Sequence, residues 1–328
     1  MKPKSDYSSE IQFDPDFMKN HLKLLSPSIF ASGCKQDHEF VDAICDSTAW
    51  SRRIETALPS LLNNYSERAF EHVPKSERPP HQYIFLGCDT FTLSHPTFDD
   101  MDKQDKKDVV MISGPRVDIE VNASGRLKKH KISFRDVVSV VKCSLTAASG
   151  HDRVAKWSRH LLISRPDLFG TYVLSANTRS YQILWSDASG EIASPLYKWT
   201  ELAPLAAYVS SLYIPPQHHV LFDPSVTREL DPLTNKQTWS IKNLHGGAHT
   251  GCTLVFSGDD PWRRRMHAWK CLNEQGRTVV IKNVFNAIDK GWNESAFLRC
   301  VHWHGVYPGV VRKLSSDNPA PLPSVWTA

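Results

Sequence analysis

Apolar residues near the N-terminus recur at helical spacing. The stretches 38–50 and 52–65 place apolar side chains three and four positions apart, and Asp37 and Ser51 precede them as capping candidates. Residues 1–18 are mostly polar and have no sustained period, so we expect a disordered tail there. The pattern predicts two helices that pack against later elements.

The middle of the chain alternates between strand-like and helix-like patterns. Short β-branched runs predict strands of one sheet, at 109–112, 117–121, 136–144 and within 170–194. Helical spacing returns twice, over 151–166 and over 201–214. Residues 19–225 therefore predict an α+β region with one mixed sheet.

Strand signals resume after Ile214–Ser225, a segment with three prolines that reads as a linker. Three runs predict a second, antiparallel sheet, at 236–244, 251–258 and 277–285. We expect five regions in all: a tail (1–18), the α+β region (19–225), a linker (226–236), a small lobe with a sheet and one helix (237–314) and an irregular tail (315–328).

The composition narrows the class of protein. A chain of 328 residues with 41% apolar residues is long enough for two cores, and its net charge of +4 is scattered, which gives no support for nucleic-acid binding. The seven cysteines form no C-x-x-C pair. No signal peptide or membrane-spanning run is evident, so we expect a cytoplasmic or nuclear protein without membrane association.

A glycine-rich turn and a lysine-bearing strand are the first candidates for chemistry. Gly246, Gly247 and Gly251 lie in the turn 245–251, where the missing side chains allow backbone amides to approach phosphate groups. Val279–Ile281 form an apolar run that ends at Lys282, whose ammonium could pair with phosphate oxygens. Taken singly, a lysine at a strand end is usually just solvated.

A helix with a glutamate is expected after this strand. Glu294 follows Lys282 by twelve positions, and apolar residues around it have helical spacing, at Trp292, Phe297, Leu298 and Val301. A further strand is predicted over 310–314. Glu294 is therefore a candidate ion-pair partner of Lys282.

These parts follow one another as in the ATP-holding lobe of a protein kinase. With the strand pair and aspartate turn of 179–199, residues 117–314 resemble the fungal-type protein kinase family, in which an extension precedes the ATP lobe. The resemblance implies ATP as the ligand, with Mg²⁺ bound only with nucleotide, and a Lys282–Glu294 ion pair. Ala248 and Thr253 depart from the glycine and valine of the kinase loop.

The sequence after Leu314 departs from the family. Residues 315–328 do not continue into a large lobe, which in kinases carries the catalytic aspartate and the magnesium ligands. We therefore expect a truncated, inactive kinase-like chain whose exposed apolar face favours self-association. A large lobe encoded downstream in the gene is another explanation. A non-catalytic interaction module, or a pseudokinase-like regulator with an unidentified protein partner, is the alternative function.

Three other sets of residues are candidates for metal or nucleic-acid binding, and each has a simpler explanation. Asp118 with Val140–Lys142 resembles the layout of restriction-endonuclease-like folds, but valine occupies the glutamate position of that metal site. His218–His219 and His302–His304 lack a cysteine or carboxylate at zinc-site spacing and read as surface or helix-capping histidines. The Trp262–Arg265 cluster, with Trp269 nearby, reads as a solvated loop or an insert between strands.

Overall fold

The computed structural model describes residues 11–25, 29–30, 34–46, 50–79, 81–87, 91–94, 108–113, 130–133, 136–143, 150–230, 237–242, 248–257, 265–272, 276 and 278–286. The chain separates into an N-terminal unit, Met1–Asp223 with Asp259–Trp262, and a C-terminal unit, Pro224–Gly258 with Arg263–Ala328. The division falls two residues before the predicted boundary at Ser225. None of the helices in the described ranges is long and apolar enough to cross a membrane.

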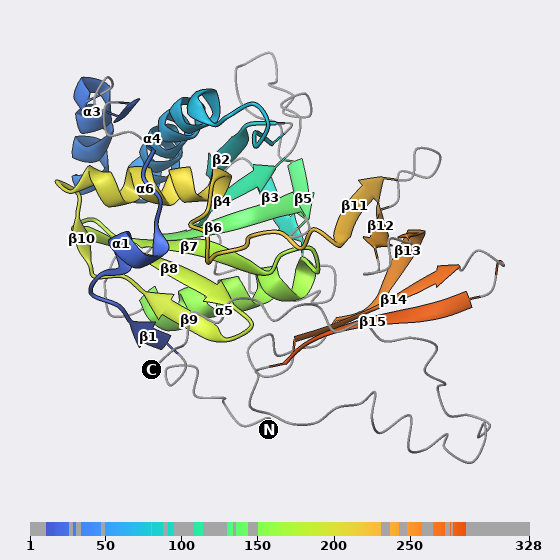
Figure 1. Ribbon diagram of the computed structural model, residues 1–328. Helices are drawn as coiled ribbons and strands as arrows, with labels where there is room; N and C mark the ends of the chain where they lie inside the picture. The colour runs from blue at the N-terminus through green and yellow to red at the C-terminus, as the bar shows by residue number, and fades with distance from the viewer. Residues whose placement is uncertain are drawn as a thin grey trace. The chain divides into compact units, whose positions relative to one another are not determined.

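The N-terminal unit is built on one mixed sheet, as predicted (Figure 1). Its strands are β1 (Ile11–Phe13), β2 (Tyr83–Gly87), β4 (Asp108–Ser113), β6 (Val137–Cys143), β7 (Gly170–Ala176), β8 (Ser180–Asp187), β9 (Gly190–Ala193) and β10 (Tyr197–Lys198). The order is β1-β9-β8-β7-β6-β4-β2, with β10 beside β8. The pairs β1–β9 and β6–β7 are parallel and the others antiparallel. A separate parallel pair joins β3 (Phe91–Ser94) to β5 (His130–Ser133).

Helices lie on both faces of this sheet (Figure 1). They are α1 (Phe17–His21), α3 (Cys34–Cys45), α4 (Trp50–His72), α5 (Gly150–Ser164) and α6 (Leu202–Tyr213). One core cluster joins α3, α4 and α6 to one face, and a second joins α5 to the other. The α+β class predicted from the sequence is confirmed, as are the helices expected over 151–166 and 201–214.

The central strand β6 shows why its sequence looks as it does. Every residue of Val137–Cys143 is buried, because helices cover both faces of the sheet at this point. A strand buried on both faces needs apolar side chains at successive positions and not only at alternate ones. The valine-rich run that predicted a strand is therefore also the signature of a three-layer arrangement.

Two buried serine–tyrosine pairs fasten α6 to its surroundings. Tyr208 Oη lies 2.7 Å from Ser139 Oγ, which donates to the Tyr172 carbonyl at 2.5 Å. Since that serine proton is used, the tyrosine hydroxyl donates to the serine oxygen. Tyr213 makes the same arrangement with Ser66 of α4 at 2.6 Å. These bonds give the apolar α6 a fixed position along the sheet.

Two predictions about the ends of the N-terminal unit are wrong. The expected tail over residues 1–18 includes strand β1 and the start of α1, because β1 pairs with the edge strand β9. The segment 214–225 is not a linker, since its backbone is hydrogen-bonded to the residues that follow α5: Phe169 N donates to Leu221 O, and Asp223 N donates to Asp167 O. Residues 214–223 thus belong to the N-terminal unit.

The C-terminal unit is an antiparallel meander of five strands. They are β11 (Val226–Leu230), β12 (Gln237–Lys242), β13 (Ala248–Ser257), β14 (Arg265–Leu272) and β15 (Thr278–Asn286), paired in chain order. Strand β11 lies inside the predicted linker 226–236, which is therefore wrong over its first half. Strand β14 was also missed, because its basic residues suggested a loop.

A disulfide joins the two central strands of the meander. Cys252 of β13 and Cys271 of β14 are bonded, with 4.5 Å between their Cα atoms. This separation is typical of directly opposed residues that exchange no backbone hydrogen bonds in an antiparallel pair. The search for C-x-x-C pairs did not reveal this bond, because the strand register brings together two residues that are 19 positions apart in the sequence.

Candidate functional site

Lys282, the proposed phosphate-contacting lysine, lies in the middle of β15 and not at its end. Its side chain is exposed, whereas Val279 and Ile281 on the opposite face pack against a small core that contains Trp239 and Trp269. The alternation follows from strand geometry, in which successive side chains point to opposite faces. Lys282 therefore belongs to the solvent face of the meander.

The strand register defines what surrounds Lys282 on this face. Ala268 is directly opposite Lys282, and Phe256 is opposite Ala268. In the next row, Lys270 is opposite Val280. The large apolar side chains are well exposed: Val280 by 63%, Leu272 by 61% and Phe256 by 48%. We call the set Phe256, Ala268, Lys270, Leu272, Val280 and Lys282 the lysine face.

Gly251, the one glycine of the predicted turn among the described residues, does not come near Lys282. Gly251 is five residues before Phe256 on β13, which is about 15 Å along the strand, and β13 is two strands, about 10 Å, from β15. One phosphate group cannot bridge that separation. Gly251 lies in the first half of β13, whereas Phe256, in the row of Lys282, lies near the end of that strand.

Gly251 has a structural reason to be glycine. Its φ is +63°, in the left-handed region, and a Cβ there would meet no atom within 4 Å. The register between β12 and β13 shifts between Trp239 and Ile241, opposite Gly251. A positive-φ glycine is characteristic of such a β-bulge. The backbone conformation therefore explains why this position is glycine, without any contact to a ligand.

The other proposed nucleotide-site residues, Gly246, Gly247 and Glu294, lie outside the described residues, as do His302, His304 and Asp118. The ion pair between Lys282 and Glu294 stays a prediction. Residues 258–264, between β13 and β14 in the sequence, are also outside the described residues.

The Trp262–Arg265 cluster is not a solvated loop at its C-terminal end. Arg265 begins β14 with only 1% of its surface exposed, and Trp269 is fully buried. Arg265 Nε donates to His267 Nε2 at 3.1 Å, so His267 carries its proton on Nδ1 and donates it to Ser257 Oγ, 3.0 Å away. Burial, reinforced by Arg265, holds the pKa of His267 well below its ordinary value. With its proton directed at the serine, His267 is not a general base toward Ser257.

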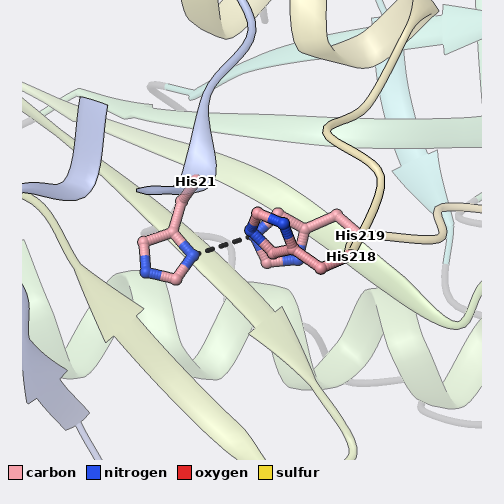
Figure 2. Close-up of side chains that lie close together, drawn as sticks. All are labelled: His21, His218 and His219. Carbon is pink, nitrogen blue, oxygen red and sulfur yellow. Dashed lines mark hydrogen bonds between the residues drawn. The ribbon is translucent and has the colours of Figure 1, made fainter. Parts of the chain in front are cut away.

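A second group of polar side chains, which the sequence did not predict to come together, lies in the N-terminal unit. His21 at the end of α1 meets His218 and His219, which follow α6 (Figure 2). One nitrogen from each ring lies within 4.8 Å of one nitrogen from each of the others. His21 and His219 are 4% and 3% exposed. The expectation that His218 and His219 are surface histidines is wrong for His219.

Hydrogen bonds order the protons of this histidine cluster. His21 Nε2 donates to Asp14 Oδ2 at 2.9 Å, which leaves Nδ1 with its lone pair toward His219 Nε2, also at 2.9 Å. Burial lowers the pKa of His21, against the opposing effect of Asp14. Burial and the two neighbouring histidines lower the pKa of His219 to about 3. His219 is therefore neutral at physiological pH.

Aromatic rings enclose the cluster. The His219 ring lies against Trp185 with centroids 4.0 Å apart and meets Tyr172 edge-on at 5.9 Å. Phe17 packs against His21, with centroids 4.8 Å apart. The Tyr172 hydroxyl donates to the His21 carbonyl at 2.7 Å, which fixes the backbone that carries the first histidine.

The described residues do not form the metal site that a restriction-endonuclease-like fold would require. Val140 is buried in the core under α5, and Lys142 is buried with its ammonium 5.8 Å from the Trp157 ring. Asp108, not Asp118, is the residue opposite Lys142 in the register of β4 and β6. A magnesium site of that layout needs clustered carboxylates, and a buried valine occupies one of its positions.

Comparisons with protein-family models, with curated proteins and with solved structures each gave no match.

Proposed function

We propose that the C-terminal unit is a lobe of the fungal-type protein kinase kind that binds adenine nucleotide weakly through the lysine face. On this proposal, the 328 residues by themselves do not transfer phosphate. The observation that carries the proposal is the pairing of Lys282 with an exposed apolar surface on the same face of one meander. A lysine that is merely solvated does not require exposed apolar side chains beside it.

The lysine face offers both kinds of contact that a nucleotide requires. Exposed Phe256 and Val280 provide apolar surface for a base, and aromatic side chains in particular stack on bases. Lys270 and Lys282 are diagonal neighbours on adjacent strands, about 7 Å apart at their Cα atoms. Two ammonium groups at that spacing can contact adjacent phosphates of one ligand.

Weak binding is expected from the rest of the unit. Gly251 lies far from Lys282 in the register of the meander, so a phosphate held by Lys282 gains no contact with its backbone amide. An affinity on the order of 1 mM corresponds to only about −4 kcal/mol. Magnesium would enter only with the nucleotide.

The proposed loss of phosphate transfer rests on the motifs that the 328 residues carry. They include no His-Arg-Asp and no Asp-Phe-Gly sequence. Phosphoryl transfer depends on positioning and on neutralising the charge of the transferring group, which those motifs provide. Incubation with radiolabelled Mg-ATP and a protein acceptor should leave acceptor labelling at the buffer background.

An NMR titration with Mg-ATP tests the binding proposal. Lys282→Ala should weaken binding about tenfold, the loss expected for one charge-assisted bond. Lys242→Ala is the matched control, because Lys242 is an exposed lysine of the same sheet outside the lysine face. Equal binding by the wild type and Lys282→Ala, or no binding at several millimolar ATP, would overturn the proposal.

The second candidate function is a non-catalytic interaction module, and the exposure of Val280 and Leu272 favours it. Exposed apolar patches often mark protein contacts, and a second copy of the chain could serve as the partner. Sedimentation at micromolar concentration should then show association that Leu272→Ser abolishes. A monomer in both samples would argue against it.

We also propose an intracellular location, in the cytoplasm or the nucleus, which the Cys252–Cys271 disulfide makes testable. Disulfides are rare in reducing compartments. Alkylation of free thiols in freshly lysed cells would show the pair reduced if the proposal holds. A fully oxidised pair would point to an oxidising compartment instead.

A further inference from the structure

We propose that His21, His218 and His219 form a site for a divalent transition-metal ion, with Zn²⁺ as the best fit. The site lies wholly within the N-terminal unit and is independent of the nucleotide proposal. Three imidazoles with one water in the fourth position are a known ligand set for zinc. Imidazole nitrogen also suits copper and nickel, whereas magnesium and calcium prefer oxygen.

The spacing of the nitrogens is close to what the ion needs. Zinc–nitrogen bonds of about 2.0–2.1 Å in a tetrahedral site place two ligand nitrogens about 3.3 Å apart. His21 Nδ1 and His219 Nε2 are 2.9 Å apart, and no pair in the cluster exceeds 4.8 Å. Small ring rotations therefore bring all three nitrogens to bonding distance.

The hydrogen bonds around the cluster orient two of the rings for binding. Asp14 accepts the Nε2 proton of His21, so the Nδ1 lone pair faces the other two histidines. This carboxylate–histidine arrangement is the usual support of a metal-bound imidazole. His218 Nε2 donates to the Asn20 carbonyl, which leaves its Nδ1 unprotonated. His219 would move its proton from Nε2 to Nδ1, with no net proton released.

Asp14 is itself held in place. Its Oδ1 accepts the Asp16 amide at 2.8 Å, and its Oδ2 accepts Asn20 Nδ2 at 3.0 Å. Because these bonds fix the carboxylate, they also fix the His21 ring. Asp14 is therefore a positioning residue of the site and not a ligand.

Two of the three histidines lie near the surface of the unit. His219 lines a hollow of about 430 Å³ together with Glu77, Pro215 and Phe222. His218 is only partly buried. The bound ion would join α1 to the segment after α6, two segments separated by 198 positions in the sequence.

The competing explanation is that the histidines form a purely structural hydrogen bond. A measurement of metal binding distinguishes this explanation from the metal site. Full-length protein without a histidine tag is titrated with Zn²⁺ by calorimetry, and with Co²⁺ by visible absorption. We expect one ion per chain and the intense ligand-field bands of tetrahedral Co²⁺. His218→Ala, which removes the least buried ring, should weaken Zn²⁺ binding more than tenfold, whereas exposed His81→Ala should not change it.

The positioning role of Asp14 has its own readout. Asp14→Asn should weaken Zn²⁺ binding about 10- to 100-fold, as expected for loss of a supporting carboxylate, while the Co²⁺ spectrum keeps its tetrahedral form. Circular dichroism checks that each variant is folded. Equal Zn²⁺ affinity in the wild type, His218→Ala and His81→Ala, or an octahedral Co²⁺ spectrum in the wild type, would overturn the proposal and leave the structural hydrogen bond.

Discussion

The sheets of the two units differ in how they are covered. The sheet of the N-terminal unit has helices on both faces and two apolar clusters. Among its described residues, the meander of the C-terminal unit has one small cluster, and the other face exposes Phe256, Leu272 and Val280. A covered sheet gains its stability from burial, whereas an open one needs a cross-link, a partner or a ligand. The difference locates the proposed nucleotide contacts on the C-terminal unit.

The largest effect is expected from breaking the buried ion pair of the N-terminal unit. Arg165 Nε and Nη2 donate to the Asp167 carboxylate at 2.8 and 2.7 Å, and Nη1 donates to Val137 O. Asp167→Ala leaves a buried charge without that carboxylate and should cost about 3–5 kcal/mol of unfolding free energy. Denaturant unfolding should show the loss. Asp16→Ala, at an exposed position, should stay within about 0.5 kcal/mol.

Loss of the disulfide should affect the C-terminal unit selectively. The bond closes a loop over 19 positions, which corresponds to about 3 kcal/mol in the chain-entropy treatment. In Cys252→Ser/Cys271→Ser, hydrogen exchange should accelerate in β13 and β14 and stay unchanged in β6 and β7. Cys45→Ser, at an exposed free thiol, is the control. Faster exchange in both units would show that they do not respond separately.

A smaller loss is expected from Gly170→Ala at the start of β7. A Cβ at this position would lie 2.4 Å from Trp185 Cζ2 and 3.1 Å from the Ser186 carbonyl oxygen. Trp185 must shift, and overpacking of this kind costs about 1–3 kcal/mol. Because Trp185 stacks on His219, Zn²⁺ affinity should fall as well. Unchanged stability would show that the strand adjusts freely here.

Acid should weaken the C-terminal unit through His267. Its folded pKa lies well below the ordinary value of 6.5, because burial and Arg265 disfavour the charged ring. Below pH 6.5 the unfolded chain therefore binds a proton that the folded unit does not, and stability falls as pH falls. The slope approaches about 1.4 kcal/mol per pH unit for one proton. Denaturant unfolding followed by the Trp269 indole NMR signal should lose this slope in His267→Gln.

The smallest effect should come from the lysine face itself. Exposed Lys270 and Lys282 contribute little to folding, so the alanine variants should change unfolding free energy by less than about 0.5 kcal/mol. The same variants should weaken nucleotide binding. A large stability loss would mean that these side chains have a structural role.

Local patterns in the sequence predicted many of the helices and strands. The strands that were missed depend on pairing with residues elsewhere in the chain. The helical face of 151–166 and the valine run of β6 were recognisable because their periods are local. Strand β1 was missed because its pairing partner, β9, lies far along the chain. Strand β14 was missed because its arginine and lysine side chains hid an alternation in which His267, Trp269 and Cys271 are buried.

The candidate sites show the same limit more sharply. A motif of residues in order suggested that Gly251 and Lys282 share a ligand, but the additional strand β14 separates them. The histidine cluster depends on His21 meeting residues 198 positions later, which no local spacing reveals. Its one signal was the His218–His219 pair directly after a strongly apolar helix, where a turn packs back onto the core.

Hydrogen–deuterium exchange with and without Mg-ATP tests the central claim most directly, because it reads both units in one sample. We predict slower exchange in peptides from β13, β14 and β15, no change in β6, β7 and α6, and loss of the effect in Lys282→Ala. Slowing confined to the N-terminal unit, or no change in either unit at saturating nucleotide, would contradict the assignment of the nucleotide contacts to the lysine face.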